Sequence, residues 1–200
     1  MLEEFGNIDI YLLDQLMKGR INKNMRILDA GCGSGRNSYF FIRQGMDVYG
    51  IDDNEKGMAT LWDLIPQWNP NFDRARFLVS DIIDMPHPDQ HFDYIICNAV
   101  LHFAKNSMHF MQLFDELMRV LRPKGILFIR MTSKHTVEHL IQLVEDGVYQ
   151  LPDGSTRYLL DIQLLAQLIK KYNLKPIEQL KTTNVANLRS MTTLVLQKVG

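Results

Sequence analysis

The chain has 200 residues, a formal net charge of −1, 46% hydrophobic residues and 22% charged residues. This length suits one domain with a substantial core, and the fractions are ordinary for a globular protein. Because the sequence shows no contiguous basic run and no long apolar run, neither polynucleotides nor membranes are favoured as partners. The acidic start does not resemble a signal peptide, and Cys32 and Cys97 beside apolar runs are typical of reduced core thiols, so we expect a cytoplasmic protein.

Apolar runs and amphipathic segments alternate along the chain with short turns between them, which is typical of a parallel sheet wound with helices. Strands are predicted at 25–30, 47–52, 76–81, 92–99 and 126–131. Helices are predicted at 36–44, 55–65, 107–121, 136–145 and 161–172. A turn or small hairpin is predicted at 151–160, and two closing strands at 175–183 and 190–199, joined by a short loop that would allow antiparallel pairing. No repeat or linker interrupts the sequence, so we predict one domain over 1–200.

The stretch ILDAGCGSGRNSYF, residues 27–40, places glycines at positions 31, 33 and 35 between two apolar runs. A strand followed by a glycine-rich turn and a helix is where an α/β sheet binds ligands, since glycine allows a tight turn and close approach to the backbone. The dinucleotide fingerprint requires a small residue where Arg36 stands, and the P-loop pattern is not present. A nicotinamide oxidoreductase is therefore disfavoured, although measurable affinity for NADH would revive it.

Acidic residues around this turn indicate a different ligand. Asp29, two residues before the first glycine, would repel a pyrophosphate but attract a positively charged group. S-adenosylmethionine, which joins adenosine to a sulfonium and an amino-acid end, fits such a site. Asp52 lies 17 residues beyond Gly35, close to the offset of roughly 20 at which an acidic residue meets ribose hydroxyls. Asp81 follows the third predicted strand, where a carboxylate could read the adenine amino group, and Asn98 ends the fourth beside the cofactor's reactive end.

Five ordered segments carry a resemblance to a known family: ILDAGCGSGRN, VYGIDDN, VSDI, FDYIICNAVLHF and VLRPKGILFI, within residues 27–130. They resemble the successive motifs of class I S-adenosylmethionine-dependent methyltransferases. The resemblance implies a Rossmann-like three-layer α/β sandwich with a seven-stranded, mostly parallel sheet whose last strand is antiparallel. The tetrapeptide GRNS also resembles the tellurite-resistance methyltransferase branch.

The resemblance also implies roles for individual residues. The methionine part of the cofactor would be surrounded by Asp29, Gly31, Cys32, Gly33 and Gly35, with Asn98 beside it. Asp52 would bind the ribose, with Asp53 next to it or merely solvated, and Asp81 with Ile82 would recognise adenine. Arg36 would cap or pair near the cofactor carboxylate, the alternative being an exposed helix surface.

Two residues are candidates for catalysis. His102 follows the strand-four motif at the edge of the expected crevice and could act as a general base, or could simply pack there. Tyr11 lies on an amphipathic segment that is either a packed helix or part of a lid, because members of this family often close the active site with their N-terminal segment. The resemblance therefore implies a helical lid over 1–24 and a substrate-side insertion over 132–160.

We therefore expect methyl transfer from S-adenosylmethionine to a small-molecule acceptor by in-line displacement at the sulfonium methyl, without a metal. Two other functions stay open: a non-catalytic S-adenosylmethionine-binding or regulatory protein, and a methyltransferase acting on RNA or protein. The acceptor atom is not determined by the sequence, and either a monomer or a homodimer is compatible with it.

Overall fold

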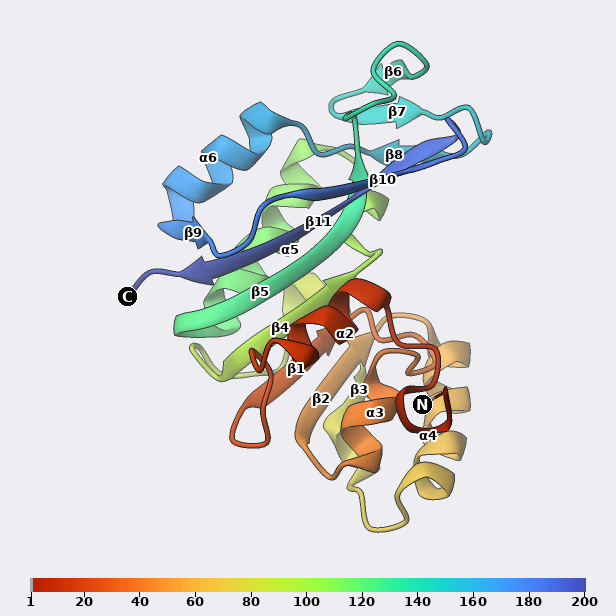
Figure 1. Cartoon of the computed structure of the whole chain (residues 1–200), viewed down its shortest axis with the longest axis vertical. Coiled ribbons are helices and arrows are strands. Elements are labelled where there is room, and N and C mark those ends of the chain that lie inside the picture. The colour runs from red at the N-terminus through yellow and green to blue at the C-terminus, as the bar shows by residue number, and fades with distance from the viewer. Residues whose placement is uncertain (1) are drawn as a thin grey trace.

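A computed structural model describes residues 2–200 and contains one large mixed sheet (Figure 1). Its strands follow the order β10-β11-β5-β4-β1-β2-β3, with β9 paired to β11. Their bounds are β1 Arg26–Ala30, β2 Asp47–Asp52, β3 Phe77–Val79, β4 Phe92–Asn98, β5 Leu121–Ser133, β9 Leu174–Pro176, β10 Lys181–Val185 and β11 Arg189–Lys198. Strands β1 to β5 are parallel, whereas β11 runs antiparallel to β5. The predicted seven-stranded sheet with an antiparallel last strand is thus confirmed, and the short β9 adds an eighth strand.

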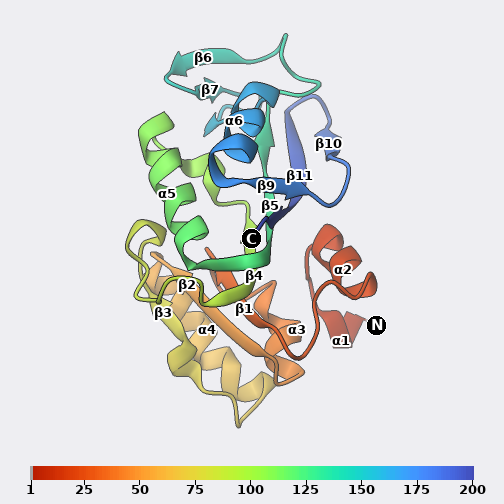
Figure 2. The same ribbon diagram turned by 90° about the vertical axis from the view of Figure 1, so that its left-hand side faces the viewer.

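Helices cover both faces of the sheet and make the three predicted layers. They are α1 Leu2–Phe5, α2 Ile10–Met17, α3 Ser38–Arg43, α4 Glu55–Trp68, α5 Ser107–Val120 and α6 Ile162–Tyr172, with short 3-10 turns η1 Arg74–Arg76, η2 Ile82–Asp84 and η3 Leu101–Phe103. Apolar side chains of α2, α3 and α4 pack in one core cluster, and those of α5 and α6 pack in another. Figure 2 shows α5 and α2 on opposite sides of the sheet.

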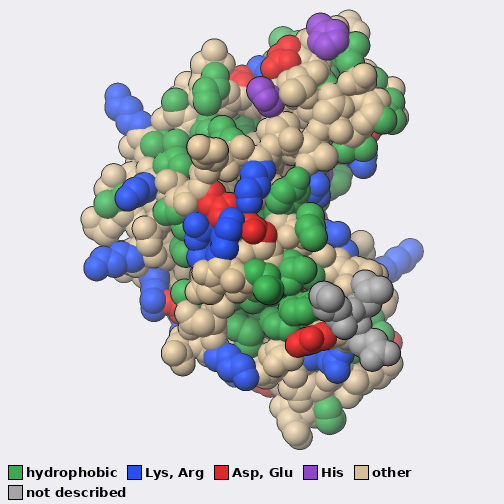
Figure 3. Space-filling model, in the orientation of Figure 1, with side chains coloured by type: hydrophobic (Ala, Val, Ile, Leu, Met, Phe, Trp, Pro, Cys, Tyr) green, Lys and Arg blue, Asp and Glu red, His purple; other side chains and the backbone are tan. Residues whose placement is uncertain are grey.

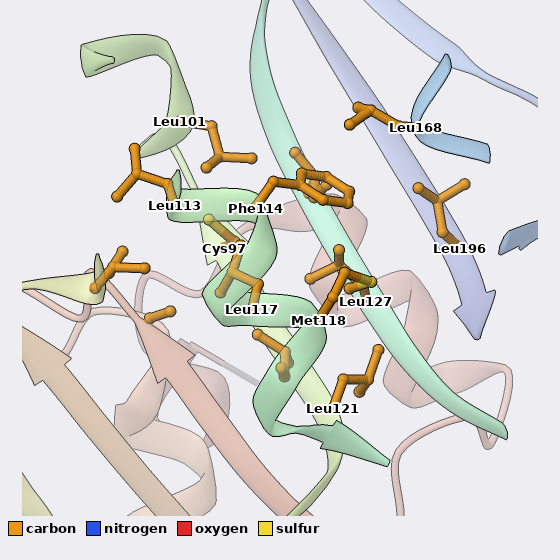
Figure 4. Close-up of a cluster of buried hydrophobic side chains, with 14 of the residues drawn as sticks. Cys97, Leu101, Leu113, Phe114, Leu117, Met118, Leu121, Leu127, Leu168 and Leu196 are labelled. Atoms are coloured by element: carbon orange, nitrogen blue, oxygen red, sulfur yellow. The ribbon is translucent and has the colours of Figure 1, made fainter. Parts of the chain in front are cut away.

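Strand β4 lies at the centre of the sheet, and most of its residues are apolar. All seven residues of β4 are buried, as expected for a central parallel strand. On one face, Leu113, Phe114 and Leu117 of α5 pack near Cys97 and Leu127 (Figure 4). This packing fixes the carboxyl ends of β1 to β4 relative to one another, and these ends form the site described below.

The prediction of a helix at 136–145 is wrong. The segment contains turns followed by β6 (Gln142–Glu145), which pairs antiparallel with β7 (Val148–Gln150), and β7 in turn pairs with β8 (Thr156–Tyr158). The chain reverses at Asp146 and Gly147, both with positive φ, and an Asp-Gly pair favours a hairpin turn over a helix. The hairpin predicted around Asp153 and Gly154 joins β7 to β8. Within residues 2–200, no helix is long and apolar enough to cross a membrane.

Candidate active site

A pocket of about 400 Å³ lies beyond the carboxyl ends of β1, β2, β3 and β4. This volume falls in the range of roughly 300–1,000 Å³ that is typical of small-molecule sites. The lining residues are Gly31, Asp52, Asp53, Asn54, Ser80, Asp81, Ile82, Ala99, Val100, Phe103, Lys105, His109 and Leu113. Five of the residues predicted to bind the cofactor, from three separate motifs, therefore meet in one pocket: Gly31, Asp52, Asp53, Asp81 and Ile82.

Asp52 is the last residue of β2 and is held in place by backbone donors. Its Oδ2 accepts the N–H of Gly33 at 2.8 Å, and its Oδ1 accepts the N–H of Asn54 at 2.9 Å. Each carboxylate oxygen can accept a further hydrogen bond. A carboxylate fixed in this way at the pocket wall is suited to bind two hydroxyl groups of a ligand.

Asp81 and Ile82 follow the neighbouring strand β3 and face the same pocket. Asp81 is exposed and caps η2, where its Oδ1 accepts the N–H of Ile83 at 3.0 Å. Ile82 is 6% exposed and belongs to the core cluster under α5. The pair thus offers one polar acceptor next to one apolar surface, an arrangement that suits the edge and the face of a planar ring.

The glycine turn after β1 is required by packing as well as by the pocket. Gly31 has a φ of +80°, and a Cβ there would lie 2.2 Å from Cγ2 of Val100. Gly35 has a φ of +85°, and its Cβ would lie 2.4 Å from Cδ1 of Leu61 on α4. Of the three alternate glycines, only Gly31 lines the pocket. Gly35 instead lets α4 approach the turn.

Asp29 is buried beneath this turn rather than at the pocket wall. Its Oδ2 accepts a hydrogen bond from the Ser38 hydroxyl at 2.6 Å. Burial raises the pKa of its carboxyl to about 6, while the Ser38 hydrogen bond and the charge of Arg36 act in the opposite direction. Asp29 therefore changes between the neutral and the anionic form near pH 6.

Two other residues of the turn are placed outside the pocket lining. Cys32 is buried, its Sγ lies 3.6 Å from Sδ of Met58, and burial raises the pKa of its thiol. Arg36 is exposed, which agrees with the surface alternative. Cys97 in β4 is also buried, with a pKa raised by burial to about 12. Both thiols are thus held in the unreactive protonated form.

Asn98, the last residue of β4, carries a buried amide with unused hydrogen-bonding capacity. The residue is 7% exposed, and within the described part of the chain neither its Oδ1 nor its Nδ2 has a hydrogen-bond partner. The next two residues, Ala99 and Val100, line the pocket. A buried polar group without a partner costs about 1–3 kcal/mol, so the position is one where a ligand can supply the missing bonds.

His102 is buried in η3, and its surroundings do not suit a general base. Nδ1 accepts the backbone N–H of Thr132 at 3.3 Å. Burial, with Arg157 and Arg189 nearby, lowers the pKa of the ring to about 4. A neutral ring whose Nδ1 accepts carries its proton on Nε2, and that nitrogen can donate but not accept. The geometry therefore favours the packed histidine over the base.

Tyr11 lies on α2, away from the pocket lining. Its hydroxyl is 2.7 Å from Oγ1 of Thr183 on β10. Its ring lies 5.4 Å from the guanidinium carbon of Arg130 and 5.8 Å from Nζ of Lys181. Tyr11 thus joins α2 to the antiparallel edge of the sheet and covers a polar region beside Asn98.

Several pocket residues were not predicted from the sequence: Asn54, Ser80, Ala99, Val100, Phe103, Lys105, His109 and Leu113. Four of these lie at 103–113, where the chain leaves η3 and enters α5, and His109 Nδ1 accepts the N–H of Lys105 at 3.1 Å. The signal that could have identified them is the segment HFAKNSMH directly after the fourth strand motif. No group of three or more metal-binding side chains occurs among residues 4–200, whose side chains the structure describes.

Comparisons with known proteins show the family of this chain. The model of the family described as "Methyltransferase domain" matches residues 28–129. The YqeM protein of Bacillus subtilis is 27% identical over 135 residues, which make up 67% of this chain and 52% of that protein. The ubiquinone biosynthesis O-methyltransferase of Rickettsia bellii is 26% identical over 146 residues, or 72% of this chain and 58% of that enzyme. The chain belongs to the class I S-adenosylmethionine-dependent methyltransferases.

Two further matches bear on the fold and on the branch of the family. A crystal structure of an S-adenosylmethionine-dependent methyltransferase from Methanosarcina mazei has a TM-score of 0.73 at 19% identity, covering 92% of this chain and 97% of that chain. The TehB protein of Haemophilus influenzae is 30% identical over 94 residues, or 47% of this chain and 32% of that protein. The chain spans about half the length of the curated relatives YqeM and the Rickettsia enzyme.

Proposed function

We propose that the protein transfers the methyl group of S-adenosylmethionine to a small-molecule acceptor. The observation that carries the proposal is the meeting of Asp52, Asp81 and Gly31 at the ends of three adjacent parallel strands around one pocket. The pocket also has the size of a small-molecule site. The relatedness to a ubiquinone biosynthesis O-methyltransferase supports an acceptor of this kind.

The residues fit the cofactor group by group. Asp52 would accept the two ribose hydroxyls with the oxygen lone pairs that Gly33 and Asn54 leave unused. Asp81 would accept a hydrogen bond from the adenine amino group while Ile82 packs against the ring. Asp29 and the turn from Gly31 to Gly35 would surround the methionine end, next to the unpartnered amide of Asn98.

When bound, S-adenosylmethionine supplies a methyl group on a sulfonium, which is already activated toward a nucleophile. The chain's own contribution is then to hold the acceptor in line with that methyl group and to exclude water. Positioning of this kind can remove up to about 7–11 kcal/mol of a barrier. His102 would contribute a hydrogen bond from Nε2 rather than accept a proton, and Tyr11 would contribute by closing the region beneath α2.

Contacts of the segment 132–160 with the start of α5 support its predicted place beside the acceptor. In the segment 132–160, Asp146 accepts the backbone N–H of Ser107 at 3.0 Å, and the hydroxyl of Tyr158 is 3.2 Å from the Ser107 hydroxyl. Ser107 begins α5, two residues after the pocket residue Lys105. We propose that 132–160 forms one wall of the acceptor site and that 1–24 forms its lid.

Calorimetric titration with S-adenosylhomocysteine, and separately with NADH, tests the cofactor assignment. We expect micromolar affinity for S-adenosylhomocysteine and no measurable affinity for NADH. Incubation with S-adenosylmethionine carrying a labelled methyl group and a panel of small phenols, amines and thiols then tests turnover. Binding without transfer to any acceptor would favour the non-catalytic alternative, and transfer only to RNA or protein would overturn the small-molecule assignment.

The affinity for S-adenosylmethionine is expected to increase several-fold between about pH 5 and about pH 7. The reason is that Asp29, whose pKa is raised to about 6 by burial, becomes an anion in this window and attracts the cationic end of the ligand. Calorimetry across this range measures the effect. The variant Asp29→Asn should show a flat profile, and an unchanged pH dependence in that variant would contradict the placement of the cationic end near Asp29.

A further inference from the structure

A row of polar side chains crosses the sheet beneath α2, and much of its hydrogen-bonding capacity is unused. Asn98 of β4 is in register with Arg130 of β5, Arg130 with Thr193 of β11, and Thr193 with Lys181 of β10. Residues in register on neighbouring strands project from the same face of the sheet. The contacts of Arg130 and Lys181 with the ring of Tyr11 show that this face is the one that α2 covers.

Most of the unpartnered buried side-chain atoms belong to this row. Among residues 2–200, no hydrogen-bond partner is found for either amide atom of Asn98, for Nε of Arg130 or for Oγ1 of Thr193. Asn98 is 7% exposed and Thr193 is 3% exposed. Native proteins leave few buried polar groups unpaired, because each costs about 1–3 kcal/mol. Four such atoms in one row therefore indicate a place where a polar ligand binds.

The charges in the row favour a singly charged anion. Arg130 makes one ion pair, from Nη1 to Oδ2 of Asp9 at 3.2 Å, although a guanidinium can hold a carboxylate through two parallel bonds. Lys181 is already paired with Asp14 at 2.8 Å and with Glu178 at 3.0 Å. Figure 3 shows such basic and acidic side chains side by side near the middle of this face. Of these two cations, only Arg130 is paired with a single carboxylate. Its planar fork can hold a carboxylate through two parallel bonds, and one guanidinium matches a singly charged anion better in charge than a dianionic phosphate.

The row also leads away from the cofactor pocket. The sheet order places β1, with its glycine turn, on one side of β4, and β5 and β11 on the other. Neighbouring strands lie about 4.8 Å apart, so Thr193 is roughly 10 Å from the strand that carries Asn98. A small molecule whose nucleophile lies near Asn98, next to the pocket residues Ala99 and Val100, could therefore reach Arg130 and Thr193 with a second group.

We propose that Arg130, together with Thr193, binds a carboxylate group of the methyl acceptor. In the absence of the acceptor, the carboxylate of Asp9, the residue that caps α2, occupies part of this binding position. Asp9 is suited to this role because it is attached to the lid and not to the sheet. It caps α2 through the N–H of Tyr11 at 2.9 Å, and its own N–H donates to Oδ1 of Asn37 at 3.0 Å. Release of the Asp9–Arg130 pair would thus link acceptor binding to movement of α2. The assignment rests on the proposed function, since it names the acceptor class of that site.

The test uses the protein saturated with S-adenosylhomocysteine and titrated with glycine, 3-aminopropanoate and 4-hydroxybenzoate, each compared with its primary amide. We expect at least one carboxylate to bind and its amide to bind at least roughly tenfold more weakly. Arg130→Gln should weaken carboxylate binding roughly 30-fold or more, as for loss of one partner of a buried charge pair. Asp9→Asn should strengthen it, because asparagine still caps α2 but no longer competes for the guanidinium.

Two controls separate binding from folding. Arg130→Gln leaves the Asp9 carboxylate buried and unpaired, so the neutral double variant Asp9→Asn/Arg130→Gln provides a folded protein that should also fail to bind the carboxylate. Arg76→Gln removes a guanidinium that pairs with Asp47 at 2.7 Å, on strand β2 at the opposite end from Asp52. That variant should bind the carboxylate like the wild type.

Three outcomes would overturn the assignment. If S-adenosylhomocysteine binds but none of the carboxylates does at millimolar concentration, the acceptor class is wrong while the proposed function stands. If Arg130→Gln weakens S-adenosylhomocysteine roughly tenfold and leaves 5′-methylthioadenosine unaffected, Arg130 holds the carboxylate of the cofactor instead. If the wild type binds no S-adenosylhomocysteine, the proposed function fails and this assignment fails with it.

Discussion

Asp52→Ala is expected to weaken binding of S-adenosylhomocysteine roughly 100-fold or more. In the proposed complex both carboxylate oxygens of Asp52 accept ligand hydroxyls, and a hydrogen bond to a charged group contributes about 1.5–3 kcal/mol. The two bonds together therefore correspond to at least two orders of magnitude in affinity. Calorimetric titration of the wild type and the variant measures the difference directly.

The substitution also removes the acceptors of two backbone N–H groups, so the loss of affinity must be separated from a distorted turn. Asp47→Ala supplies a matched control, because Asp47 lies at the other end of the same strand β2 and pairs with Arg26 and Arg76. We expect that variant to bind S-adenosylhomocysteine like the wild type even if its melting temperature falls. Affinity that survives in a folded Asp52→Ala protein would contradict the proposed place of the ribose.

Gly31→Ala is expected to lower the free energy of unfolding by about 2 kcal/mol or more. The added Cβ would lie 2.2 Å from Cγ2 of Val100, on a backbone with a φ of +80°. Overpacking a well-filled site costs about 1–3 kcal/mol, and a left-handed conformation costs a residue with a Cβ roughly 1–2 kcal/mol. Denaturant titration of the ligand-free protein measures the sum.

Gly33→Ala separates these two contributions. Gly33 has a φ of +52°, but a Cβ there would meet no atom within 4 Å. We therefore expect only the conformational cost, about 1 kcal/mol. Equal losses at the two positions would show that contact with Val100 does not determine the stability of the turn. Such a result would also remove the packing argument for glycine at position 31.

The sequence by itself was sufficient for the order of the main elements and for five of the thirteen residues that line the pocket. Predicted strands at 47–52 and 92–99 agree with β2 and β4 to within one residue. The second of them is nearly all apolar, which is characteristic of a buried parallel strand. The carboxyl ends of parallel strands meet at one edge of a sheet. This is why the sequence alone could predict that Asp52 and Asp81, which are far apart in the chain, lie in one pocket.

The secondary-structure prediction failed where a helical spacing of apolar residues competes with a turn signal. The segment 136–145 has apolar residues at helical spacing, yet it forms turns and β6 because Asp146 and Gly147 reverse the chain and pair it with β7. For His102 the sequence left open a general base or a packed histidine, and its contacts favour the packed one. Its burial and its bond with Thr132 come from β5, a strand whose position relative to η3 the motif does not describe.

The family and the acidic residues of the pocket follow from the sequence, since motif, strand and turn are properties of neighbouring residues. The polar row beneath α2 follows only from the tertiary structure. Asn98, Arg130 and Thr193 come from three strands, and what brings them together is the register of β4 with β5 and of β5 with the antiparallel β11. Register depends on how every residue of those strands packs against the helices on both faces. The strand register therefore cannot be predicted from the spacing of these three polar residues in the sequence.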